Sequence, residues 1–150
     1  MQTANRHQIA QVLEINNKSL NVKIPVIGRI AAGVPIEAIE TTVSMSLDTL
    51  LGGGELVALE VRGDSLVEEG ILNGDKVICR LQNTAKEGEI VFALTHRRDI
   101  ALKRISYKVK NRIILYPSNV KQLPQAYSPA EVEILGIYVG LLRINSSTPR

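Results

Sequence analysis

Two residues of this chain, Ser65 and Lys103, have side chains that could act as a nucleophile and its base. Ser65 follows an apolar run at 56–61 and an Arg-Gly-Asp sequence at 62–64. A serine in a glycine-containing turn after a strand exposes its hydroxyl and can point backbone N–H groups at a nearby carbonyl. This is the arrangement that an acyl-transfer nucleophile needs.

Lys103 lies in the run DIALKRIS at 99–106. If this run is a strand, its period of two places Lys103 on one face with Ala101 and Ile105. Burial on an apolar face disfavours the ammonium form, so the pKa of Lys103 should fall. A neutral lysine can take the proton of a serine hydroxyl, and the pair would then form a Ser–Lys dyad.

Each residue also has an ordinary interpretation. A serine beside a glycine is common in turns, and a strand lysine usually extends its ammonium group into water. The other reactive side chains are few: His7, His96 and Cys79 form a poor zinc-ligand set. Glu68, Glu69 and Asp75 are more typical of a polar turn than of carboxylate catalysis. We therefore expect neither a metal nor a cofactor.

Several motifs resemble the LexA/UmuD family of self-cleaving proteases. The segment at 61–79, VRGDSL followed by GILNGDKVIC, is similar to the family's nucleophile segment, with Leu66 where the family usually has Met. The residues LKRI at 102–105 are similar to its lysine strand, and GRIAAGVPIEA at 28–38 to its cleavage site. LYPSN at 115–119 and VEILGIYVGLLR at 132–143 resemble its closing motifs, so the resemblance covers about residues 24–145.

The resemblance implies a serine endopeptidase that cuts itself. It assigns Ser65 as the nucleophile and Lys103 as the general base. It implies that the backbone N–H groups of Asp64 and Ser65 stabilise the oxyanion, and that the Ala32-Gly33 bond is cleaved. A glycine after that bond lets the backbone enter a tight site.

The chain reads as mostly β. Runs of about five to ten residues rich in Val, Ile and Leu alternate with Gly, Pro and Asn, which is typical of strands and turns. We expect strands within 24–30, 55–63, 75–81, 88–95, 99–109, 112–119 and 132–144, a helix at 4–14, and two short strands within 12–24. The resemblance implies a twisted antiparallel pseudo-barrel with an N-terminal arm that carries the cleavage site.

Composition sets the remaining expectations. The 150 residues are 45% apolar and 22% charged, with a net charge of +3, which suits one globular domain and is too mild to indicate nucleic-acid binding. One cysteine precludes an intramolecular disulfide, and we find neither a signal peptide nor a membrane-spanning run of about 18 apolar residues. We expect a cytoplasmic protein with an arm at 1–23, a peptidase domain at 24–145 and a disordered tail at 146–150.

The resemblance leaves two classes of protein open. Residues 12–23 are similar to the wing hairpin of a winged helix-turn-helix, which favours a truncated LexA-type repressor without a complete DNA-binding domain. The short arm instead favours a UmuD-like subunit that regulates a translesion DNA polymerase. Either class implies a role in the SOS response to DNA damage, with cleavage stimulated by a RecA–single-stranded DNA filament.

Two surface features remain open from the sequence. The apolar run at 132–144 is either core or a strand that joins two copies into a homodimer. A group of basic residues is either a solvated hairpin or a patch for an anionic partner; it consists of Arg97, Arg98, Lys103, Arg104, Lys108, Lys110 and Arg112.

Overall fold

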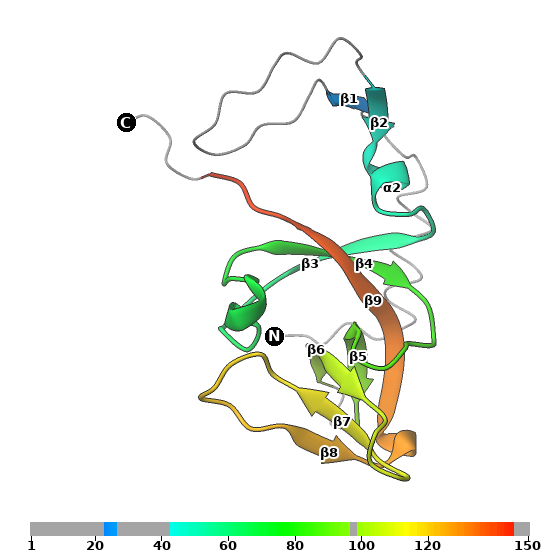
Figure 1. Cartoon of the computed structure of the whole chain (residues 1–150), viewed down its shortest axis with the longest axis vertical. Helices are drawn as coiled ribbons and strands as arrows, with labels where there is room; N and C mark the ends of the chain where they lie inside the picture. The colour runs from blue at the N-terminus through cyan, green and yellow to red at the C-terminus, as the bar shows by residue number, and fades with distance from the viewer. Residues whose placement is uncertain (1–22, 27–42, 97–98, 146–150) are drawn as a thin grey trace.

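The computed structural model describes residues 23–26, 43–96 and 99–145, and every structural statement below concerns these ranges. Its main feature is a seven-stranded antiparallel sheet with the strand order β3-β4-β9-β5-β6-β7-β8 (Figure 1). The strands are β3 (Leu56–Glu60), β4 (Lys76–Leu81), β5 (Ile90–Thr95), β6 (Ile100–Ser106), β7 (Ile113–Tyr116), β8 (Gln125–Tyr127) and β9 (Val132–Leu142).

Shorter elements complete the fold. Strands β1 (Lys23–Val26) and β2 (Val43–Ser46) form a separate antiparallel pair, and helix α2 (Leu47–Leu50) leads from β2 towards β3. Two short 3-10 helices, η1 (Val67–Glu69) and η2 (Pro129–Glu131), precede β4 and β9. Glycine residues at 52–54, all with positive φ, form the joint between α2 and β3.

Strand β9 joins the two halves of the sheet. Its first half pairs with β5 from Val132 to Ile137, and its second half pairs with β4 from Gly136 to Leu142. In Figure 1 this long strand runs between the β3–β4 pair and the β5–β8 ribbon. Both edge strands, β3 and β8, therefore reach the functional site described below although they stand at opposite ends of the sheet order.

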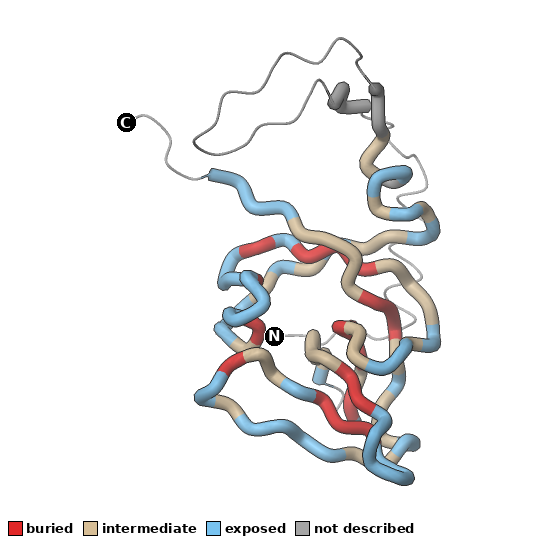
Figure 2. Tube along the Cα trace, viewed as in Figure 1, coloured by how far each residue is buried: buried red, intermediate tan, exposed pale blue. Residues whose placement is uncertain are grey.

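The core consists of two apolar clusters, seen as the buried segments of Figure 2. Phe92 belongs to the first cluster, whereas its neighbours Val91 and Ala93 belong to the second. Successive residues of a strand point to opposite faces, so β5 packs on both sides. This explains why the sequence IVFAL is continuously apolar rather than alternating.

The mostly β prediction is confirmed, and strands lie within every predicted run from 55 onward. The sequence analysis missed β2 and β8, which are only four and three residues long. Of the predicted strand at 24–30, residues 24–26 lie in β1. The predicted helix at 4–14, the strands before residue 23, most of the arm and the tail at 146–150 lie outside the described residues.

Candidate active site

Ser65 lies in the turn that connects β3 to η1. The next residue, Leu66, is only 2% exposed and packs in the first apolar cluster. Ser65 itself is half-buried. The buried leucine fixes the turn to the core, while the serine beside it stays at the surface of a cleft.

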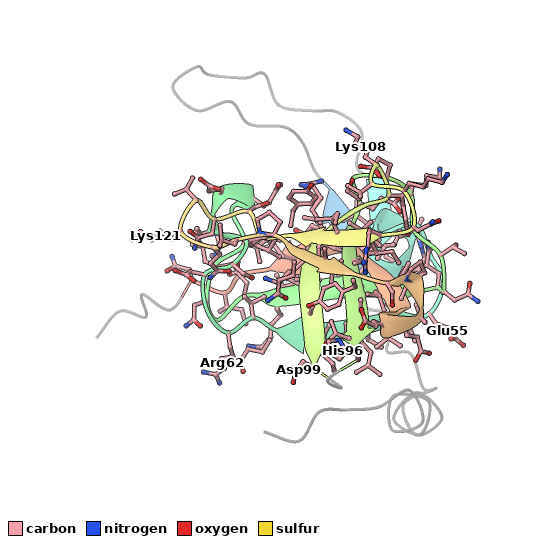
Figure 3. All side chains as sticks on the ribbon, turned by 90° about the horizontal axis from the view of Figure 1, so that it is seen from below. Glu55, Arg62, His96, Asp99, Lys108 and Lys121 are labelled. Carbon is pink, nitrogen blue, oxygen red and sulfur yellow. The ribbon has the colours of Figure 1, made fainter. Side chains whose placement is uncertain are left out.

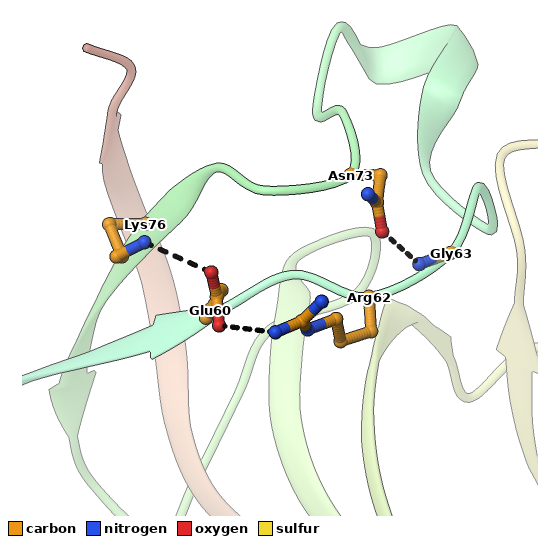
Figure 4. A network of polar contacts seen from close by, with 5 residues as sticks. All are labelled: Glu60, Arg62, Gly63, Asn73 and Lys76. Atoms are coloured by element: carbon orange, nitrogen blue, oxygen red, sulfur yellow. Dashed lines mark hydrogen bonds and ion pairs between the residues drawn. The ribbon is translucent and has the colours of Figure 1, made fainter. Parts of the chain in front are cut away.

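The chain on either side of Ser65 is held by polar contacts (Figure 4). The Gly63 N–H donates to Asn73 Oδ1 at 2.9 Å, which ties the start of the turn to the segment before β4. Gly63 has a φ of +93°, a conformation that favours glycine. Just upstream, Glu60 accepts from Arg62 at 3.1 Å and from Lys76 at 3.2 Å. These contacts give the turn a defined shape.

The backbone of the turn presents unused donors. The N–H groups of Asp64, Ser65 and Leu66 donate to no acceptor in the part of the chain that the structure describes. By contrast, the Val67 N–H donates to the Asp64 carbonyl at 3.2 Å. Successive free N–H groups beside a serine hydroxyl can bind the oxygen of an attacked carbonyl.

Lys103 lies in the middle of β6, as the sequence predicts. Its neighbours on the same face, Ala101 and Ile105, belong to or pack against the second apolar cluster, and the fully buried Val91 lies opposite on β5. Burial lowers the pKa of the Lys103 ammonium below its ordinary value, because an apolar surrounding disfavours the charged form. The fraction of neutral amine near neutral pH therefore increases.

Ser65 and Lys103 line the same cleft, although 38 positions separate them in the sequence. The cleft has a volume of about 1040 Å³. Much of its wall is apolar, and this part consists of Leu59, Val61, Leu66, Val77, Ile100, Ala101, Leu102 and Ala126. A cleft of this size and character suits an extended apolar peptide.

Polar side chains line the rest of the cleft. Arg62, His96 and Asp99 all lie towards the lower side of Figure 3. The rings of His96 and Tyr127 contact each other edge to face, with centroids 5.9 Å apart. This contact holds the short edge strand β8 against the end of β5.

The structure tests only part of the predicted site. It brings Ser65 and Lys103 to one cleft, but no hydrogen bond joins their side chains among the described contacts. The N–H groups of Asp64 and Ser65, which the resemblance assigns to the oxyanion, donate to no acceptor in the described ranges, and their role stays a prediction. The Ala32-Gly33 bond lies outside the described residues.

Sequence reasoning missed the residues that support the turn from behind. Asn119 Nδ2 donates to the Asp64 carbonyl at 2.8 Å, and Gln122 Nε2 donates to Asp64 Oδ1 at 3.0 Å. Arg104, adjacent to Lys103, binds Glu69 of η1. Asn119 could have been singled out, because it ends the LYPSN motif. The motif alone, however, does not show that Asn119 contacts Asp64.

The sequence predicts that three acidic residues, Glu68, Glu69 and Asp75, belong to a polar turn. Glu69 accepts from Arg104 and from Ser118, which makes it a link between elements. Asp75 is 2% exposed, and the hydrogen bonds from Arg143 and the Leu72 N–H lower its pKa to about 2. Both contacts favour a structural role for these carboxylates.

Other predicted features have simple places in the fold. Cys79 is fully buried, and burial raises the pKa of its thiol to about 12. Three of the described basic residues lie apart: Lys103 lines the cleft, Arg104 contacts Glu69, and Lys108 lies on the opposite side of Figure 3 from the cleft residue Asp99. Arg97 and Arg98 lie outside the described residues.

The described ranges offer neither a metal-binding cluster nor a membrane-spanning helix. No group of three or more His, Cys, Asp or Glu side chains is placed to hold a metal ion there. No helix in the same ranges is long and apolar enough to span a membrane.

Comparison with known proteins yields consistent matches. A family model described as peptidase S24-like matches residues 25–139. The LexA repressor of Novosphingobium aromaticivorans is 46% identical over 123 residues, which make up 81% of this chain and 52% of that protein. The LexA repressor of Pseudothermotoga lettingae is 41% identical over 142 residues, which make up 93% and 70% of the two chains. The LexA repressor of Erythrobacter litoralis is 44% identical over 123 residues, again 81% and 52%. The chain thus spans about half the length of two of these relatives.

Proposed function

The chain belongs to the peptidase S24-like family, together with the LexA repressors, and on this premise we propose that it is a serine endopeptidase that cuts its own Ala32-Gly33 bond. The observation that carries the proposal is the shared cleft, in which Ser65 and a lysine of lowered pKa lie together. The apolar segment IAAGVP at 30–35 has the character that this cleft accepts.

The proposed reaction uses Ser65, Lys103, the backbone N–H groups of the turn and a water molecule. Neutral Lys103 accepts the Ser65 hydroxyl proton as Oγ bonds to the carbonyl carbon of Ala32. The oxygen of that carbonyl becomes an oxyanion that the N–H groups of Asp64 and Ser65 bind. The C–N bond then breaks, and Lys103 returns the proton to the amine of Gly33. Water then gives a proton to Lys103 as its oxygen bonds to the ester carbon, and Lys103 passes this proton to Oγ as the ester C–O bond breaks. This releases the carboxyl group of Ala32 and restores Ser65 and neutral Lys103.

We place this reaction in the SOS response, stimulated by a RecA–single-stranded DNA filament. The filament would favour the state in which the arm occupies the cleft, and it would supply no catalytic group. The relatives described above are LexA repressors, which favours cleavage as the switch of a repressor over a UmuD-like role with a translesion polymerase.

The direct test is incubation with activated RecA filament, followed by mass spectrometry. The expected products are residues 1–32 and 33–150. Ser65→Ala should give neither product under the same conditions. A new N-terminus at any residue other than Gly33 would refute the assigned bond.

We also propose that the protein is a homodimer that pairs through the second half of β9. From Tyr138 to Leu142 this strand pairs with β4 on one edge, and no strand of the described ranges pairs with its other edge. Leu142 and Ile144 beside it are 46% and 85% exposed. An unpaired strand edge flanked by exposed apolar residues is suited to pairing with a second copy.

A further inference from the structure

The segment Ser118–Gln122 packs behind the nucleophile turn and contacts it repeatedly. The Glu68 N–H donates to the Ser118 carbonyl at 3.0 Å, and Ser118 Oγ donates to Glu69 Oε1 at 3.0 Å. Asn119 and Gln122 contact the carbonyl and the carboxylate of Asp64 respectively. The same segment includes Lys121, at the left of Figure 3.

Asn119 differs from the other residues of this segment because it is buried and contacts the backbone next to Ser65. Both ends of its side-chain amide are engaged: Nδ2 donates to the Asp64 carbonyl at 2.8 Å, and Oδ1 accepts from the Lys121 N–H at 2.9 Å. The residue is 7% exposed. Since one partner only accepts and the other only donates, the orientation of the amide is fixed.

This bond controls the direction of a catalytic donor. The Asp64–Ser65 peptide is planar and trans, so its C=O and N–H point in opposite directions. Holding the Asp64 carbonyl on Asn119 therefore holds the Ser65 N–H pointing away from Asn119. The Val67 N–H, at 3.2 Å from the same carbonyl, is the longer of its two contacts.

We propose that Asn119 is a positioning residue that orients the Ser65 N–H to bind the oxyanion. This inference rests on the proposed self-cleavage. It gives Asn119, the last residue of the LYPSN motif, a role separate from those of Ser65 and Lys103. Its effect should appear in the rate of the chemical step, because the oxyanion exists only there. It should leave the pKa of Lys103 unchanged, since Asn119 contacts the turn and not β6.

The test compares two substitutions in this segment at alkaline pH without RecA. Asn119→Asp keeps the acceptor for the Lys121 N–H but removes the donor to the Asp64 carbonyl, because an aspartate is ionised at these pH values. Lys121→Gln is the matched control, since it changes the net charge by the same amount at an exposed side chain that makes no hydrogen bond or ion pair in the described ranges. Both chains are first checked for a wild-type circular dichroism spectrum.

Removing an oxyanion donor outright costs about 10²- to 10³-fold in rate, so misdirecting one should cost about 10- to 100-fold. We expect this loss in the plateau rate of Asn119→Asp, with the midpoint of the pH profile unchanged and Lys121→Gln within about threefold of wild type. A plateau rate of Asn119→Asp within threefold of wild type, a shifted midpoint, or an equal loss in Lys121→Gln would overturn the inference.

A second measurement leaves Asn119 itself unchanged. In the Ser65→Ala chain, the Asn119 side-chain amide proton that binds the Asp64 carbonyl should be protected from exchange with water in NMR spectra. Free exchange would show that the bond to Asp64 is absent and would refute the inference. A wild-type chain that never cuts itself refutes the proposed function, whereas normal cutting by Asn119→Asp refutes only the role of Asn119.

Discussion

At the scale of single residues, the proposed reaction depends on an amine and a hydroxyl that do little for the fold. Ser65 is half-buried, and its hydroxyl makes no hydrogen bond within the described ranges. Lys103 forms no ion pair there, and only burial moves its pKa. A lysine without an anionic partner is free to lose its proton, which a general base must do.

Ser65→Ala should therefore abolish self-cleavage and leave the fold intact. We expect a free energy of unfolding within about 0.5 kcal/mol of wild type, since the lost hydroxyl has no partner. Urea unfolding, measured alongside the cleavage assay, checks both parts. A chain that unfolds as well as failing to cut would show that Ser65 has a structural role.

The glycine turn and the alternating strand are local patterns that make Ser65 and Lys103 candidates, and the resemblance to the LexA/UmuD family assigns their roles, which stay a prediction. The sequence could not predict Asn119 or Arg104 as supports of the turn. Their partners, Asp64 and Glu69, are 55 and 35 positions away, and nothing local marks such a contact. Residues that act through long-range hydrogen bonds become visible only when the fold brings them together.

At the scale of elements, two clamps define where the nucleophile turn sits. One is the segment Ser118–Gln122 behind it. The other joins the segment before β4 to the end of β9: Arg143 binds both oxygens of Asp75, at 2.7 and 2.6 Å, and also the Gly70 carbonyl at 2.8 Å. The Val61 N–H donates to the Asp75 carbonyl at 2.8 Å, which connects this clamp to the chain before Ser65.

The Asp75 clamp predicts a loss of stability in acid. The pKa of Asp75 falls from its ordinary value of 3.8 to about 2 in the folded protein, chiefly through the hydrogen bonds from Arg143. Protons therefore bind the unfolded chain more readily. The stabilisation is complete above about pH 4 and disappears as the pH falls from 3.8 to about 2.

Asp75→Asn should remove this pH dependence. We expect it to be less stable than wild type at pH 7, with the difference shrinking between pH 4 and pH 2. Urea unfolding over this range measures it. Glu68→Gln, an exposed carboxylate of the next turn with no side-chain hydrogen bond, is the control. A constant difference at all pH values would contradict the role of the Asp75 carboxylate.

The close pairing of β9 with β4 predicts a second effect on stability. A Cβ on Gly136 would lie 2.5 Å from the Arg80 carbonyl oxygen, and a backbone cannot yield as a side chain can. Gly136→Ala should therefore destabilise the protein by about 1–3 kcal/mol, as overpacked cores do. Thermal or urea unfolding is the measurement.

Gly140→Ala in the same strand is the matched control. Its Cβ would meet only the end of the Leu51 side chain, at 2.8 Å, which can turn away. It should cost clearly less than Gly136→Ala. Equal losses would show that the close approach of the two backbones is not the cause.

Most strands could be predicted because Val, Ile and Leu runs with turn residues between them are local signals. Strands β2 and β8 were missed because they are short and carry mixed sequences, VSMS and QAY. Their pairing depends on the partner strands β1 and β7, which only the fold brings beside them. For the same reason, the sequence could not show that β3 and β8 border one cleft from opposite ends of the sheet.

At the scale of the whole molecule, the main open question is assembly. No described strand pairs with the outer edge of residues 138–142, and this leads us to expect a homodimer at micromolar concentration, measured by light scattering. This half of β9 contains no charged residue, so the dimer should depend little on salt. A monomer at that concentration would contradict the proposal.

Leu141→Pro would remove one backbone N–H from this strand, but it would also break the pairing with β4. A better probe is Ile144→Asp, since Ile144 is 85% exposed and follows the strand. It should weaken the dimer without unfolding the monomer. An unchanged dimer would place the interface elsewhere.

The central claim is that neutral Lys103 takes the proton of Ser65, and the pH dependence of self-cleavage tests it most directly. The rate without RecA is measured by intact mass from about pH 6 to pH 10, in wild type and in Lys103→Arg. A base must be neutral to act, and burial lowers the pKa of Lys103 below its ordinary 10.5. The wild-type rate should therefore rise with pH and level off once Lys103 is neutral. Lys103→Arg should be inactive throughout, since a guanidinium keeps its proton. A flat wild-type profile, or cutting by Lys103→Arg at alkaline pH, would contradict the account.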